Sequence, residues 1–234
     1  MPELAERITT IIVNYKTAAL TKACYNTFRA AYPTLPLILI DNYSRDKSTE
    51  YIRAIGESDP LTTPVFHTTN LGHGPAMAVA IKSIKTPFVF TLDSDCEMLK
   101  GGLLEAMMKK VDANANLYAI GWLRWVDKRT GVPYSWHTKP KPPKTAYFNA
   151  YIHPYAAIYR LSMYRTLRPF HDHGAPCLYN MIDAVDRQFD LETFELKTYV
   201  KHHIAGTRRM FKDYWHPKDN EVPKEWKAKG NHPI

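Results

Sequence analysis

Two aspartates separated by one residue, Asp93 and Asp95, directly follow a run of apolar and β-prone residues at 87–92. Residues two apart in a strand point to the same side, so these carboxylates converge while Ser94 between them turns away. Converging carboxylate oxygens suit Mg²⁺ or Mn²⁺, and through such an ion a diphosphate. The segment therefore predicts a metal site at the end of a buried strand.

The elements that must position these carboxylates alternate between strands and helices. A βαβαβαβ order is typical of an α/β fold with a mostly parallel sheet flanked by helices. We expect strands at 8–13, 37–40, 64–68 and 87–92, and helices at 17–29, 48–55 and 76–84.

Polar side chains follow three of the predicted strands. Asn14 and Tyr15 end the first, Asp41 ends the second, and Asp93 and Asp95 end the fourth. Ligands of open α/β sheets bind at the carboxyl ends of the strands, where these residues would gather. Their convergence is stronger evidence for a site than any single motif.

The second half of the chain is less regular. A turn at 127–131 suggests a hairpin that returns through 132–136, and a proline-rich basic loop follows at 139–144. We expect further strands at 117–125, 155–159 and 194–200, and helices at 101–111, 161–167 and 177–189.

The composition is that of an ordinary globular protein, with 45% hydrophobic and 23% charged residues among 234. No apolar run approaches the roughly 18 residues of a membrane span, and the start has no signal-peptide pattern. Three widely spaced cysteines indicate neither a disulfide framework nor a zinc site, so a reduced, cytoplasmic setting is expected. The net charge of +8 fits a phosphate-rich ligand, and the basic tail at 211–234 is compatible with peripheral contact with an anionic membrane. No nucleic-acid-binding motif accompanies it, so no nucleic-acid partner is expected.

Four motifs in this order resemble the inverting family 2 glycosyltransferases of the GT-A fold, especially the rhamnosyltransferase-like branch. They are Ile11-Ile12-Val13-Asn14-Tyr15, Ile40-Asp41-Asn42-Tyr43-Ser44, Asn70-Leu71-Gly72-His73-Gly74 and Asp93-Ser94-Asp95. More loosely, residues 155–160 resemble the acceptor-side strand, 180–186 the acidic helix and 203–207 the late histidine motif. The likeness implies one GT-A domain over 1–210, with a nucleotide-sugar-binding half at 1–97 and an acceptor half at 98–210.

The resemblance implies metal-dependent, inverting transfer of a sugar from a nucleoside diphosphate donor (UDP-, dTDP- or GDP-sugar) to a hydroxyl acceptor. The acceptor would be a glycan, a lipid-linked sugar or another alcohol, and the cofactor Mn²⁺ or Mg²⁺. The residues implied to contact the nucleotide sugar are Val13, Asn14, Tyr15, Asp41, Asn70, Gly72, Asp93 and Ser94.

The resemblance also implies a metal shell and a general base. Asp93, Asp95 and His203 correspond to the metal ligands, with His202 as the rival because neighbouring residues of a strand face opposite sides. Asp183 corresponds to the base that deprotonates the acceptor hydroxyl. The glutamate that usually precedes this aspartate is replaced by isoleucine, so Asp186, one turn further on, is the rival base.

Two other functions remain open on the sequence. A sugar nucleotidyltransferase would share an α/β nucleotide-binding core, but it needs a glycine-rich phosphate loop after the first strand, and residues 14–18 contain no glycine. A basic nucleic-acid or membrane-surface binding module would show salt-sensitive binding to polyanions and no donor hydrolysis. Neither accounts for the polar residues at the strand ends.

Overall fold

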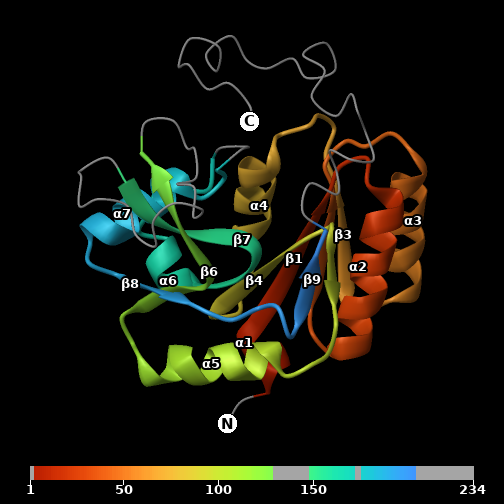
Figure 1. The fold of residues 1–234 in the computed structure, drawn as a ribbon. Coiled ribbons are helices and arrows are strands. Elements are labelled where there is room, and N and C mark those ends of the chain that lie inside the picture. Colours follow the sequence, from red (N-terminus) through yellow and green to blue (C-terminus); the bar gives the residue numbers. More distant parts are fainter. Residues whose placement is uncertain (1–2, 129–147, 172–174, 204–234) are drawn as a thin grey trace.

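A computed structural model describes residues 3–128, 148–171 and 175–203 of the chain (Figure 1). Seven strands form one sheet in the order β3-β2-β1-β4-β7-β6-β8. The four strands of the first half all pair in parallel, as their alternation with helices predicted: β1 (Ile8–Asn14), β2 (Leu37–Asp41), β3 (Thr62–Phe66) and β4 (Phe88–Asp93). The predicted α/β fold with a mostly parallel sheet is confirmed.

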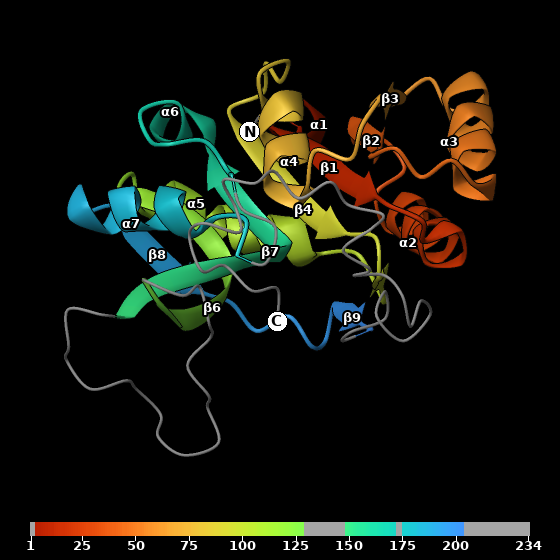
Figure 2. The same cartoon turned by 90° about the horizontal axis from the view of Figure 1, so that it is seen from above.

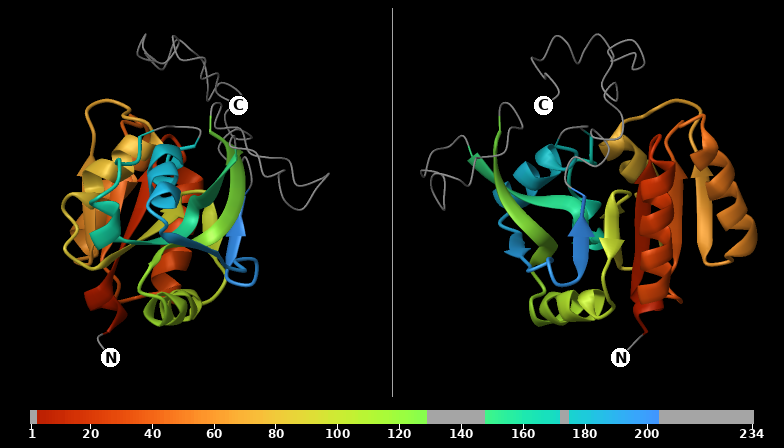
Figure 3. Two further views of the ribbon diagram at one scale, coloured as in Figure 1. Left: turned by 90° about the vertical axis from the view of Figure 1, so that its left-hand side faces the viewer. Right: turned by 45° about the vertical axis from the view of Figure 1, so that its right-hand side comes forward.

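The second half extends this sheet in mixed directions. β7 (Phe148–Arg160) is antiparallel to β4, β6 (Leu117–Asp127) is antiparallel to β7, and β8 (Asp190–Thr193) is parallel to β6. β5 (Cys96–Met98) and β9 (Val200–His202) form a separate antiparallel pair and lie side by side (Figure 3). This pair brings the end of the described chain back to Asp95.

The strand predicted at 194–200 was wrong. The chain forms β8 before this segment and begins β9 only at its last residue. Between them the backbone turns, because the N–H groups of Tyr199 and Val200 both donate to the carbonyl of Leu196. The Leu196 side chain is buried, so the apolar residues of this segment pack into the core from a loop. The predicted return at 132–136, the proline-rich loop and the tail lie outside the described residues.

Helices cover both faces of the sheet (Figure 2). The core on one face contains buried side chains of α2 (Ala18–Ala31), α3 (Lys47–Ser58) and α5 (Leu103–Ala113). The core on the other face contains those of α4 (His73–Ile81), α6 (Leu161–Tyr164) and α7 (Leu178–Asp186). A short helix, α1 (Leu4–Arg7), precedes β1. Burial on both faces explains why β2 is a nearly continuous apolar run and why β1 consists mostly of β-branched residues.

The register of the parallel strands brings their polar ends together. Asn14 lies opposite Asp41, and Val13 lies opposite Asp93. These strands therefore carry their predicted site residues to one edge of the sheet. All three cysteines are free and buried. No helix among the described residues combines the length and apolar character needed to cross a membrane.

Candidate metal and nucleotide-sugar site

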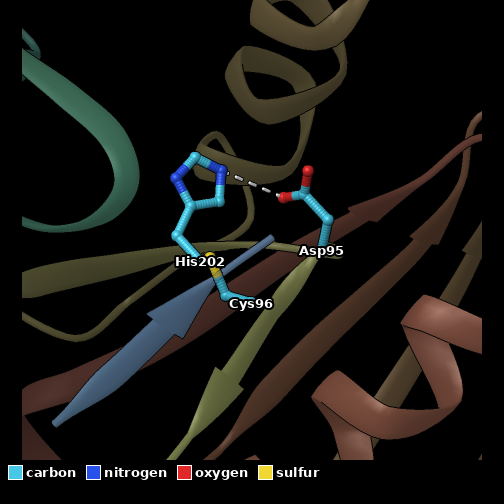
Figure 4. A group of neighbouring side chains, drawn as sticks. All are labelled: Asp95, Cys96 and His202. Atoms are coloured by element: carbon cyan, nitrogen blue, oxygen red, sulfur yellow. Dashed lines mark ion pairs between the residues drawn. The ribbon is translucent and has the colours of Figure 1, made fainter. Parts of the chain in front are cut away.

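The carboxylate of Asp95 faces an imidazole from the far end of the described chain (Figure 4). His202 Nε2 lies 3.4 Å from Asp95 Oδ1. The β5–β9 pairing sets this contact, because it places Cys96 opposite His202. The ligand atoms of Asp95, Cys96 and His202 all lie within 4.8 Å of one another.

Asp93 adds a second carboxylate at the end of β4. Its side chain is 18% exposed, and its Oδ1 atom is buried with no hydrogen-bond partner. Burial raises the pKa of Asp93; the charge of His73 opposes this rise and that of Asp95 adds to it. A buried carboxylate oxygen without a hydrogen bond is costly unless a cation compensates it, so this oxygen fits a metal ligand.

His73 was missed by the sequence reasoning. It is the first residue of α4, and its Nε2 lies 3.4 Å from Asp93 Oδ1. The signal was available, since a histidine directly after Gly72 enters a helix at the edge where Asp93 was expected.

The two adjacent histidines face different carboxylates. His203, the predicted ligand, forms a hydrogen bond with Glu97 through Nε2, and that bond is the main reason why the pKa of Glu97 is lowered. His202, the rival, faces Asp95. Burial lowers the pKa of His202, but the hydrogen bond and charge of Asp95 outweigh burial and raise it. The structure thus brings the rival to Asp95.

The residues present fit a divalent ion with hard ligands. Asp95 supplies a carboxylate oxygen, His202 an imidazole nitrogen, and Asp93 a buried oxygen at the same strand end. Cys96 does not fit. Burial raises the pKa of its thiol well above the usual value, and the charge of Asp93 adds to this rise. Its neutral thiol instead donates to the carbonyl of Tyr155 at 3.6 Å.

Asn14 is the centre of a buried hydrogen-bond network and is fully excluded from solvent. The contacts join the ends of β1 and β2 to the start of α2, so Asn14 organises the site edge from within. Its direct contact with a nucleotide sugar, as the resemblance implied, stays a prediction. Its Nδ2 donates to Asp41, Ser44 and Ser48, and its Oδ1 accepts from Thr17 and Thr21.

Asp41 and Ser94 also have internal partners. Asp41 is 3% exposed, and its carboxylate accepts hydrogen bonds from the Ser44 backbone N–H and the Thr49 hydroxyl as well as Asn14. The Ser94 hydroxyl is 3.2 Å from that of Thr17. Their predicted donor contacts remain predictions.

The turns after β1 and β2 are strained. Lys16, Tyr43 and Arg45 all have positive φ, between 55° and 71°. Side chains other than glycine rarely adopt this region, and such strain clusters at functional sites. The Ser44 hydroxyl holds the turns together, because it accepts from the Lys16 N–H while the Ser44 N–H donates to Asp41. This bracing keeps the half-buried Val13 and Tyr15 at the sheet edge.

Asn70 and Gly72 shape the entry to α4. The Asn70 Oδ1 accepts from the Gly72 N–H at 2.9 Å and from Asn42 Nδ2 at 2.8 Å. Gly72 has φ of 85°, a conformation that favours glycine. Both residues therefore position His73 at the site, and their predicted contacts with the donor are not tested by these bonds.

The carboxylate of Asp183 accepts hydrogen bonds from Arg168. Arg168 donates to its carboxylate from the backbone N–H at 2.8 Å and from Nε and Nη2 of the guanidinium at 3.0 and 2.6 Å. These bonds lower the pKa of Asp183. Asp186 is exposed at the last residue of α7. Within the described segments the carboxylate of Asp183 is bound by Arg168, and the assignment of Asp183 or Asp186 as the base stays a prediction.

Together, the parallel strands, the carboxylates at their shared edge and the returning histidine strand define an α/β domain with a candidate cation site at one edge. The sequence model of the family described as "Glycosyl transferase family 2" matches residues 9–215. The chain therefore belongs to glycosyl transferase family 2, and its class is that of the glycosyltransferases. The family-level resemblance is confirmed, and the rhamnosyltransferase-like branch stays a prediction.

Solved structures show the same fold. The mannosyltransferase PcManGT from Pyrobaculum calidifontis, in complex with GDP-Man and Mn²⁺, is similar with a TM-score of 0.65 and 16% identity; the match covers 95% of this chain and 67% of that one. TarS 1-349 from S. aureus in complex with UDP-GlcNAc is similar with a TM-score of 0.54 and 16% identity, over 86% of this chain and 61% of that one. Identities this low carry the fold alone. No curated protein matches the chain.

Proposed function

We propose that the chain is a metal-dependent, inverting glycosyltransferase that moves a sugar from a nucleoside diphosphate donor to a hydroxyl acceptor. The cluster of Asp93, Asp95 and His202 carries the proposal, because it joins a cation-binding geometry to the edge where the predicted donor-binding residues end. Membership of family 2 favours glycosyl transfer over the sugar nucleotidyltransferase and the basic binding module.

Asp95 and His202 would hold Mn²⁺ or Mg²⁺, together with the Asp93 Oδ1 atom, which accepts no hydrogen bond from the described part of the protein. Such an ion, when bound, supplies positive charge that stabilises a departing diphosphate. The chain itself places Asp93 at the end of β4 and Asp95 in the turn before β5, and His73 at the start of α4 faces Asp93. This arrangement orients the donor before reaction.

For the donor, we propose that Val13 and Tyr15 contact the base and that Asp41 orients it. Support comes from their place at the ends of β1 and β2, next to the strained turns. The solved neighbours hold GDP-Man or UDP-GlcNAc, so UDP-, dTDP- and GDP-sugars are all candidates here. The acceptor is a glycan, a lipid-linked sugar or another alcohol.

Inversion needs a base that takes the proton of the attacking hydroxyl. Asp183 and its rival Asp186 remain the two proposed bases. The guanidinium of Arg168 weakens Asp183 as a proton acceptor, because it stabilises the charged form. For Asp183 to act, the acceptor would have to compete with this ion pair.

A pair of histidine variants tests the metal proposal. We expect His202→Gln to weaken Mn²⁺ binding, measured by electron paramagnetic resonance of free Mn²⁺, by about tenfold or more, and to remove Mn²⁺-stimulated hydrolysis across a panel of UDP-, dTDP- and GDP-sugars. His203→Gln is the matched control and should keep both. The reverse pattern would reinstate His203 as the ligand. No hydrolysis of any donor by folded wild-type protein would refute the function.

A further inference from the structure

A row of aromatic rings extends from His202, in the candidate metal site, through residues of β7 to Trp122 in β6. The Tyr155 ring stacks on the imidazole of His202, with centroids 4.6 Å apart and planes 9° from parallel. The Trp122 ring lies 5.7 Å from Tyr155 and 5.8 Å from His153. The "aromatic wall" of Trp122, His153 and Tyr155 is therefore continuous with the metal cluster.

Arg124 lies next to Trp122, at the β6 end of the aromatic wall. Its guanidinium carbon is 4.5 Å from the centre of the Trp122 ring, on the same side of β6 because the two residues are two apart. Its Nε is buried without a hydrogen-bond partner, and no carboxylate of the described segments forms an ion pair with it. Among the described residues this guanidinium thus has an aromatic neighbour but no counter-ion, which suits it to an anionic ligand.

The order of the strands in the sheet indicates which substrate Arg124 would contact. β1 and β2, which carry the proposed donor contacts, flank β4 on one side, whereas β7 and β6 lie on the other. Neighbouring strands are about 4.8 Å apart, so β6 lies about 10 Å across the sheet from β4. Trp122 and Arg124 thus lie on the opposite side of β4 from the strands that carry the proposed nucleotide contacts. This is the acceptor side of the proposed reaction.

We propose that Trp122 and Arg124 form an acceptor subsite that selects acceptors carrying an anionic group, phosphate or carboxylate. The guanidinium offers its N–H groups in a fork that matches either anion, and the indole holds it in place while presenting aromatic surface to the acceptor. The assignment to the acceptor rests on the proposed function. Anion binding by Arg124 does not.

The test measures binding of three probes by isothermal titration calorimetry: glucose, glucose 6-phosphate and glucuronate. Each is titrated into the full chain with and without Mn²⁺ and UDP or GDP. The variants are Arg124→Gln and Arg124→Lys. Arg53→Gln is the matched control, because Arg53 also stacks on an aromatic ring, Phe66 at 4.9 Å, but belongs to α3.

We expect the wild type and Arg53→Gln to bind the charged probes about tenfold tighter than glucose, the worth of one charge-assisted hydrogen bond. Arg124→Gln should lose that preference, and Arg124→Lys should keep part of it, which shows that the site is still folded. Three results would each overturn the subsite: no preference in the wild type, a preference that survives in Arg124→Gln, or nucleotide binding that falls tenfold in Arg124→Gln. The last would assign the guanidinium to the donor diphosphate. Loss of all donor hydrolysis alongside Arg124-dependent probe binding would instead remove the proposed function and leave an anion site.

Discussion

Replacing Asn14 with alanine tests whether a buried amide, rather than a contact with substrate, organises the edge of the sheet. The side chain is fully buried and joins the ends of β1 and β2 to α2. Alanine removes the bonds that the two amide hydrogens donate and those that Oδ1 accepts. Partners of its amide are Asp41, Ser44 and Ser48, and partners of its carbonyl oxygen are Thr17 and Thr21.

The loss is smaller than the number of bonds suggests, because several partners keep other contacts. The Thr17 hydroxyl lies 3.1 Å from that of Thr21, and the Ser44 hydroxyl still accepts from Lys16. We therefore expect Asn14→Ala to lower the free energy of unfolding by about 3 kcal/mol, the cost of leaving one or two buried polar groups unsatisfied. For a chain of this size, that corresponds to a fall in Tm of about 6–12 °C.

Urea unfolding followed by circular dichroism measures the change, with Asn26→Ala as the control. Asn26 makes one exposed contact, at 3.5 Å from the Tyr51 hydroxyl, so its removal should change stability by less than about 0.5 kcal/mol. A loss below about 1 kcal/mol for Asn14→Ala, together with a tenfold fall in nucleotide affinity, would refute the reasoning. Asn14 would then be a ligand of the donor, as the resemblance implied.

Other substitutions test the acceptor side and the sheet. Asp183→Asn should abolish turnover while nucleotide binding persists, measured by initial rates and calorimetry; normal sugar transfer would exclude Asp183 and favour Asp186. Because Arg168 lowers the pKa of Asp183, the stability from this pair is present above about pH 4 and lost as pH falls through the lowered pKa. Acid unfolding of Arg168→Gln should therefore depend less on pH there than that of the wild type, and an unchanged curve would contradict the pairing. Gly121→Ala would place a Cβ 2.9 Å from that of Ala157 in a rigid sheet, so we expect a loss of about 2 kcal/mol by urea unfolding, and no loss would show that β6 shifts freely.

The first half of the fold could be predicted because its signals are local. β1 is mostly β-branched and β2 mostly apolar, since parallel strands in the middle of a sheet are covered on both faces. Their polar ends follow from the same rule, as the carboxyl ends of parallel strands share an edge. The position of Asp41 and Asp93 at one edge of the sheet could therefore be predicted without knowledge of any contact.

The segment at 194–200 could not be predicted in the same way. Its apolar residues suggested a strand, but Leu196 is buried from a turn and the pairing strands lie on either side of it. β-propensity reports how well side chains fit a half-buried surface, and a loop packed on the core offers the same surface. Sequence pattern alone does not separate the two.

The choice between His202 and His203 shows where local reasoning ends. Alternation along a strand established that one imidazole faces the cluster, but not which one. That choice depends on the register of β9 against β5, where Cys96 is paired with His202 across more than one hundred residues of chain. A slip of one residue would exchange the two faces and bring His203 to Asp95. The carbonyl of Asp95 fixes the register, because it accepts from the His203 N–H at 2.9 Å. The backbone of Asp95 thus determines that His202, and not His203, faces the Asp95 side chain.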